Sequence, residues 1–164
     1  RSSGKMDRMD ADKIGMLATV MNALAVKDAL RQQGVDAVVM TSSFMPQVAE
    51  CFTSDKAIAA LESGKIVVFG GGTGNPIFST DTASALRALE IGADAMFKAT
   101  MVDAVRYDTL TFTRVLDERL AVMDSTAATL CRDNGLPILV FDLGQPANIA
   151  KAVKGESVGT LVRE

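Results

Sequence analysis

Apolar residues recur along the chain with two spacings that alternate. Between residues 10 and 33, Ile14, Leu17, Met21 and Leu24 follow the repeat of an α-helix, and Gly34 marks its end. Shorter stretches such as VDAVVM and KIVVFG are apolar almost throughout, which is typical of buried strands. The pattern predicts helices at residues 10–33, 54–64, 80–93, 110–120, 124–135 and 146–155. It predicts strands at residues 35–40, 65–70, 94–100, 136–143 and 159–162, the last of them at a sheet edge.

Strands that alternate with helices predict an α/β fold, with helices covering both faces of a mainly parallel sheet. Three helix ends carry signals of their own: Ser54 and Asp124 are the expected N-caps, and Gly64 is an expected C-cap. No linker or low-complexity segment interrupts the pattern, so residues 1–164 are expected to form a single domain. In sheets of this kind, ligands bind beyond the carboxyl ends of the strands.

Composition and charge restrict the classes of partner. The chain has 164 residues, of which 48% are hydrophobic, and this suits one domain with a substantial core. The net charge of −3 argues against a nucleic-acid-binding surface, which needs a basic stripe. The sequence has no apolar run of about 18 residues and no signal peptide, so we expect a cytoplasmic protein without a membrane partner.

The residue types that are missing restrict the chemistry. The chain has no histidine, which excludes a Ser-His-Asp triad and a zinc site built on histidine. Cys51 and Cys131 lie far apart in apolar surroundings and are expected to be reduced core residues. Any reaction must therefore rely on lysine, arginine, aspartate, hydroxyl groups, backbone amides or a metal held by oxygen atoms.

Residues 70–81, GGGTGNPIFSTD, are the main candidate for a binding loop. The segment lacks the Gly-Lys-Ser/Thr ending of a P-loop and does not fit Gly-x-Gly-x-x-Gly. It begins at the carboxyl end of the strand at 65–70, and the helix from Thr80 directs its free N–H groups toward the same place, which favours anionic oxygens. Asp81 lies in the first turn of that helix, where an acid also simply favours the helix dipole; the residues alone leave both interpretations open.

Several long segments together resemble bacterial uridylate kinases (UMP kinases) of the amino-acid kinase superfamily. They are MDRMDADKIGMLATVMNALA, GTGNPIFSTDTAS, KATMVDAV, VMDSTAATLCRDNGLPILVF and the closing GTLV, in the family's order. The resemblance implies the amino-acid kinase fold, a three-layer α/β/α sandwich, and the transfer of a phosphoryl group from ATP to UMP in pyrimidine nucleotide biosynthesis.

The chain departs from the family in two places. Family members begin with a lysine-containing strand segment and a glycine-rich segment that are not present here. They also carry a loop over adenine where VDAV here runs directly into RYDTLTF. We therefore expect that an N-terminal part and one nucleotide loop are missing from this chain, with a gap between residues 105 and 106.

The resemblance also implies the roles of individual residues. Asp81 and Lys98 correspond to catalytic residues; Asp81 would organise cationic groups and Lys98 would neutralise the transferring phosphoryl group. Thr100, Asp103 and Asp124 would contact ATP, which brings Mg²⁺. The UMP contacts would be Asp12, Thr73, Gly74, Asn75, Pro76, Ile77, Phe78, Ser79 and Thr80. Judged without the resemblance, Asp12 is a first-turn acid, Lys98 a solvated lysine at a strand end and Asp124 a helix cap.

The implied assembly is a homohexamer of dimers. The helix at 10–33 is apolar around much of its circumference, which fits a subunit interface. GTP as an activator and UTP as an inhibitor are the family's effectors, and Lys27 at one of the GTP positions leaves activation open. Two alternatives stay open: a non-catalytic nucleotide-binding domain of the same fold, and another kinase of the superfamily acting on carbamate or acetylglutamate. The GTGNPIFSTD loop argues against the second of these.

Overall fold

The computed structural model describes residues 6–101, 107–120 and 123–164. The chain divides into two compact units, residues 1–83 and 84–164. The expectation of a single domain over residues 1–164 stays a prediction. The predicted gap between residues 105 and 106 lies outside the described residues.

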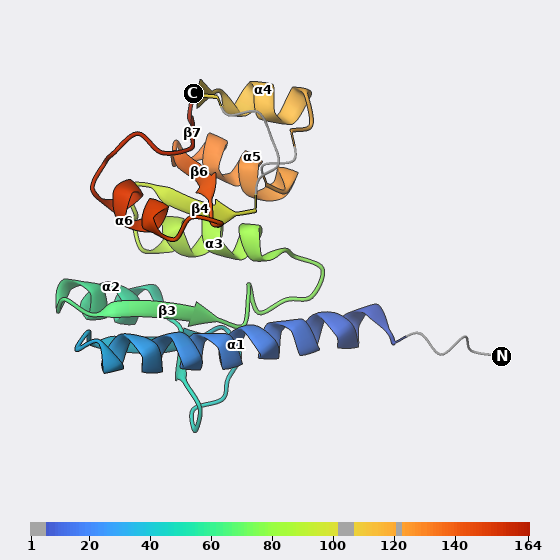
Figure 1. Ribbon diagram of the computed structural model, residues 1–164. Helices are drawn as coiled ribbons and strands as arrows, with labels where there is room; N and C mark the ends of the chain where they lie inside the picture. Colours follow the sequence, from blue (N-terminus) through green and yellow to red (C-terminus); the bar gives the residue numbers. More distant parts are fainter. Residues whose placement is uncertain (1–5, 102–106, 121–122) are drawn as a thin grey trace. The chain divides into compact units, whose positions relative to one another are not determined.

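The first unit is a small parallel sheet packed against helices (Figure 1). Its strands are β1 (Ala37–Thr41), β2 (Glu50–Cys51) and β3 (Ile66–Gly70), in the order β2-β1-β3. β1 and β3 run parallel with Val39 opposite Val68 and Thr41 opposite Gly70. The carboxyl ends of these two strands therefore lie side by side, and the glycine-rich loop begins there.

Helix α1 (Arg8–Gln32) is the longest element of this unit. It begins two residues before the predicted start because the Asp7 carboxylate accepts the backbone N–H of Met9 and caps it. Val20 and Ala23 are buried, and Ala23 packs with Leu24, Val39 and Val68. Other apolar side chains of the helix are exposed instead: Met9, Ile14, Leu17, Met21 and Val26.

Helix α2 (Ser54–Glu62) packs against β3, which lies between α1 and α2 in Figure 1. Its predicted caps are wrong by one residue at each end. Thr53, and not Ser54, is the N-cap, because the Thr53 hydroxyl accepts the N–H of Lys56; Ser63, and not Gly64, is the C-cap. β3 is also less buried than its apolar sequence predicts, since Ile66 is exposed.

The second unit contains a mixed sheet with the order β4-β6-β7-β5. Its strands are β4 (Met96–Thr100), β5 (Thr109–Leu110), β6 (Ile138–Asp142) and β7 (Thr160–Val162). The predicted edge position of the last strand is wrong, because β7 pairs with β6 on one side and with β5 on the other. The two-residue strand β5 has no pattern of its own, and residues 110–120 were predicted as a helix.

Among the described residues, four helices accompany this sheet: α3 (Thr80–Glu90), whose residues up to Ala83 belong to the first unit, α4 (Phe112–Asp117), α5 (Ser125–Asp133) and α6 (Ala147–Val153). Asp124 caps α5 as predicted, accepting the N–H of Ala127 at 2.9 Å. The helix α4 is shorter than predicted because Thr111 caps it one residue after β5 ends. The core between these elements includes Phe112, Val115, Cys131 and Ile138.

Two further sequence expectations concern the state of the two cysteines and membrane-spanning segments. Both cysteines are free; Cys131 is buried and Cys51 is partly buried. Among the residues that the structure describes, no helix is both long enough and apolar enough to span a bilayer.

Gly159, just before β7, tests how closely the backbone at this position approaches β6. Its φ is +70°, and a Cβ atom there would lie 2.0 Å from the carbonyl oxygen of Val140. We expect Gly159→Ala to lower the free energy of unfolding by about 3 kcal/mol or more, because backbone must move. Gly155→Ala is the control: its φ is +76° but its Cβ would meet nothing within 4 Å, so about 1 kcal/mol is expected. Urea unfolding measures the free energy of unfolding of both variants, and equal losses would contradict the close approach of Gly159 to Val140.

Candidate functional site

The glycine-rich loop leaves β3 through a position that only glycine fits. Gly71 has a φ of +84°, and a Cβ atom on it would lie 2.7 Å from the Thr41 hydroxyl oxygen and 2.8 Å from that of Ser42. The Ser42 hydroxyl donates to the carbonyl oxygen of Gly71 at 2.6 Å. The end of β1 therefore fixes the first residue of the loop, and it does so through hydroxyl groups.

The middle of the loop is a tight turn held by its own groups. The N–H of Gly74 donates to the carbonyl oxygen of Gly71 at 3.2 Å. The Thr73 hydroxyl accepts the N–H of Asn75 and donates to the Asn75 carbonyl oxygen, both at 3.1 Å. This arrangement occupies the Thr73 hydroxyl and fixes the backbone at Asn75.

Two side chains of α1 hold the two ends of the loop. Thr19 accepts the backbone N–H of Gly71 at 2.8 Å, and Asp12 accepts the backbone N–H of Ile77 at 2.8 Å. Asp12 and Thr19 lie seven positions apart, about two turns, and therefore on one face of the helix. The loop between Gly71 and Ile77 consequently lies along this face of α1.

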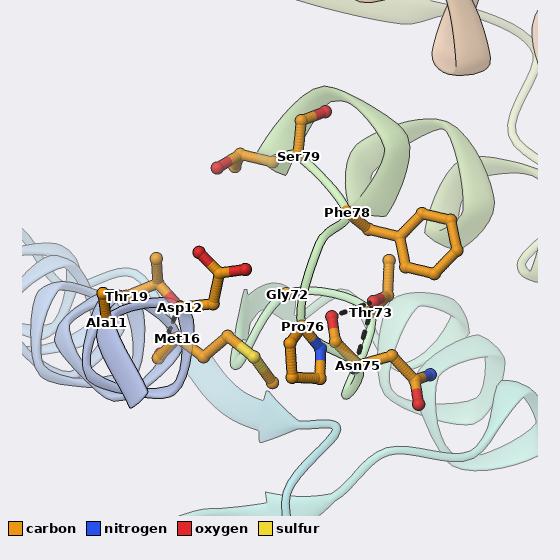
Figure 2. Close-up of a pocket in the computed structure, with 12 residues that line it drawn as sticks. Ala11, Asp12, Met16, Thr19, Gly72, Thr73, Asn75, Pro76, Phe78 and Ser79 are labelled. Carbon is orange, nitrogen blue, oxygen red and sulfur yellow. Dashed lines mark hydrogen bonds between the residues drawn. The ribbon is translucent and has the colours of Figure 1, made fainter. Parts of the chain in front are cut away.

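A pocket of about 370 Å³ lies between this face of α1 and the loop. Figure 2 shows Asp12, Met16 and Thr19 on the helix and Thr73, Asn75, Pro76 and Phe78 on the loop. The volume suits a small organic ligand. The remaining lining residues are Ala11, Gly15, Gly72, Ser79 and Thr80.

The pocket combines two kinds of electrostatic environment. It borders the N-terminus of α3, where the Ser79 hydroxyl accepts the N–H of Thr82 at 3.0 Å and Thr80 begins the helix. A helix N-terminus carries partial positive charge and favours anions. Asp12, a half-buried carboxylate, lines the other part and favours hydroxyl donors. A ligand with one anionic group and one hydroxyl-rich part would fit both.

Seven of the nine predicted UMP residues line this pocket. The other two do not: Gly74 lies in the turn, and Ile77 has an exposed side chain. Asp81 follows Thr80 in the first turn of α3 and is half-buried. The seven that the structure brings together are Asp12, Thr73, Asn75, Pro76, Phe78, Ser79 and Thr80.

The remaining predicted residues belong to the unit at 84–164. Lys98 and Thr100 lie two positions apart on β4, so their side chains are on the same face of the sheet. Asp124 is the N-cap of α5. Asp103 lies outside the described residues.

Sequence reasoning missed several residues that build these sites. Thr19 and Ser42 hold the loop, and Asp142 lies directly opposite Thr100 at the carboxyl end of β6. The spacing from Asp12 could have pointed to Thr19, because seven positions return to the same helix face. Ser42 carries no such signal, since its role depends on the pairing of β1 with β3.

Known proteins share the family and the fold of this chain. Residues 2–142 match the model of the amino acid kinase family. The structure of UMP kinase from Bacillus anthracis is similar, with a TM-score of 0.91 and 36% sequence identity, covering 96% of this chain and 70% of that one. UMP kinase from Ureaplasma parvum is similar with a TM-score of 0.91 and 32% identity, covering 97% of this chain and 72% of that one.

Proposed function

The chain belongs to the amino acid kinase family, and we propose that within this family it is a UMP kinase. It would transfer the γ-phosphoryl group of ATP to UMP and give UDP and ADP, a step of pyrimidine nucleotide biosynthesis. The observation that carries the proposal is the likeness to two UMP kinases at 36% and 32% identity over nearly the whole chain. Phosphoryl transfer requires positioning and neutralised charge rather than covalent chemistry, so a chain without histidine suffices.

In this proposal the pocket on α1 holds UMP. The phosphate would lie at the N-terminus of α3 beside Ser79 and Thr80, where N–H groups and the helix dipole favour it. Asp12 would accept from the ribose hydroxyl groups, and Thr73 and Asn75 would contact uracil or ribose. Gly74, Pro76, Ile77 and Phe78 would complete the binding segment, with Pro76 and Phe78 forming apolar walls.

The transfer itself would depend on Asp81 and Lys98. The bond between the γ-phosphorus and the oxygen that bridges to ADP breaks, and a bond to a phosphate oxygen of UMP forms. Lys98 would neutralise the transferring group as a point charge. Asp81 would orient cations rather than act as a base, because the acceptor phosphate needs no deprotonation. Thr100, Asp103 and Asp124 would contact ATP.

Mg²⁺ would enter this reaction with ATP. Mg²⁺ keeps several waters and needs only one or two carboxylates beside substrate phosphates, and it would supply charge neutralisation. Within the described ranges, no three acidic, cysteine or histidine side chains form a metal cluster. The Asp81 carboxylate fits the role of a single protein partner.

Two alternatives remain for the assay to exclude. A non-catalytic nucleotide-binding domain is disfavoured, because the similar solved structures are UMP kinases. A kinase for carbamate or acetylglutamate would need a different acceptor loop. We place the activity in the cytoplasm, where its nucleotide substrates are.

For assembly we propose a homohexamer in which α1 contributes to a contact between subunits. Ile14, Leu17 and Met21 form an exposed apolar stripe, and by the helical repeat it lies nearly opposite the face that carries Asp12 and Thr19. GTP as an activator and UTP as an inhibitor belong to the same proposal.

The activity and acceptor choice are tested together. We expect the full-length protein to give UDP from Mg-ATP and UMP, with UMP strongly preferred over CMP and no turnover of carbamate. The wrong base would leave buried polar groups unpaired, at about 1–3 kcal/mol each. A coupled ADP-release assay gives kcat/KM for each acceptor. Equal values for UMP and CMP would contradict the proposed base contacts, and turnover of carbamate instead of UMP would contradict the function.

Asp81→Asn tests the orienting role of the carboxylate. The substitution keeps the size of the side chain and its compatibility with a first turn, but removes the charge that would hold cations in place. We expect kcat to fall by about 10²–10³, as for other positioned electrostatic groups, with UMP binding kept or tightened. Steady-state kinetics and calorimetric binding of UMP separate the two effects. A near-normal kcat would mean that Asp81 is only a first-turn acid.

Met21→Lys tests the proposed subunit contact. Met21 is 70% exposed in the isolated chain, so a charge there should leave the fold intact but would be buried in the contact. We expect light scattering to show smaller species. Asn22→Lys is the matched control, since it adds the same charge beside the stripe. Leu24 is unsuitable, because it packs against buried residues of its own unit. An unchanged oligomer in Met21→Lys would exclude this face.

A further inference from the structure

Ile77 has a backbone conformation that its side chain opposes. Its φ is +80°, and among the residues that the structure describes only Ile77 and Arg119 combine a positive φ with a side chain. For a β-branched residue this region is strongly disfavoured, and such conformations persist only where the surroundings impose them. They are concentrated at functional sites.

The left-handed conformation has a visible consequence for the pocket. Pro76 and Phe78, on either side of Ile77, both line the pocket, whereas the Ile77 side chain does not and is 60% exposed. Ile77 therefore joins the two residues that wall the cavity, and its backbone conformation sets the direction of the chain between them.

The Asp12 carboxylate contacts the backbone of this strained residue. Its Oδ2 accepts the N–H of Ile77 at 2.8 Å, across 65 positions of sequence. A hydrogen bond to a charged acceptor is among the stronger ones. The other partner of the same oxygen is Arg8 at 4.0 Å, and that arginine side chain is 72% exposed, so this ion pair contributes little.

We propose that Asp12 and Ile77 form a positioning pair. Asp12 acts through the backbone of Ile77 to hold it in the left-handed conformation, and this fixes Pro76 and Phe78 as the walls of the acceptor pocket. The inference deepens the proposed function, because it assigns Asp12 a role in shaping the UMP site in addition to any contact with UMP. Without the carboxylate, Ile77 relaxes toward a favourable conformation and the walls move.

Ile77→Gly separates the two roles of Asp12, since glycine adopts a positive φ without strain and keeps the loop shape even without the hydrogen bond to Asp12. The measured quantity is the factor by which D12A raises KM for UMP. We expect about tenfold or more in the wild-type background, about threefold or less in the I77G background, and no change in KM for ATP in either. I77V is the matched control, because valine keeps the β-branched strain and should leave the tenfold effect intact.

D12N supplies the conservative comparison. The side-chain amide oxygen of D12N still accepts the N–H of Ile77. The rise in KM for UMP caused by D12N should therefore differ less between the wild-type and I77G backgrounds than the rise caused by D12A. If the factor for D12A is the same in the wild-type, I77G and I77V backgrounds, Asp12 acts only on the ligand and the positioning pair is wrong.

Urea unfolding tests the pair without any substrate. D12A should lower the unfolding midpoint less in the wild-type background than in the I77G background, because the strained Ile77 can relax once the hydrogen bond is lost whereas a glycine has no strain to release, and such a difference is the signature of two coupled residues. I77N replaces I77G if that variant does not fold, because asparagine also tolerates a positive φ. Should the wild-type full-length protein make no UDP, the proposed function fails while this comparison still decides the inference. Equal shifts of the midpoint in both backgrounds would overturn it.

Discussion

The candidate site depends on two backbone N–H groups of one loop that donate to side chains of one helix. Thr19 accepts from Gly71 and Asp12 accepts from Ile77, so the loop is attached to α1 at its two ends. Loop backbone usually finds partners in water or in its own turn. Here the helix provides them, and the pocket between helix and loop exists because the attachment leaves space around Gly15, Met16 and Gly72.

The existence and order of the main elements, and the position of the loop, could be predicted from the sequence. The pairing of the strands and the contacts between the elements could not. The long helix at α1 and the cap at Asp124 follow from local patterns, and both are present. The strand β5 does not follow from such a pattern, because a strand of two residues carries no periodicity. The interior position of β7 does not either, because strand order is set by contacts between residues that are far apart in the sequence. The cap of α2 at Thr53 instead of Ser54 reflects the usual uncertainty of one residue at a helix end.

The same division holds within the candidate site. Most residues of the GTGNPIFST segment could be assigned to the pocket because the segment is continuous, and seven of the nine predicted UMP residues, Asp12 among them, line it. Thr19 and Ser42 could not be assigned in this way, since their roles arise from contacts across 52 and 29 positions. Ile77 was expected as a contact residue, and its positive φ is a property of the backbone that an isoleucine at that position does not suggest.

The spacing of the two anchors restricts how this protein can change over evolution. Each residue of an α-helix turns the chain by about 100°, so inserting or deleting one residue between Asp12 and Thr19 would carry one anchor off the face that meets the loop. Substitutions along this stretch are far less restrictive, because most of its side chains face elsewhere. Related chains that share this loop should therefore differ in residue identity between the anchors while keeping the count of residues fixed, and length variation should accumulate in segments such as residues 43–48, outside the helix.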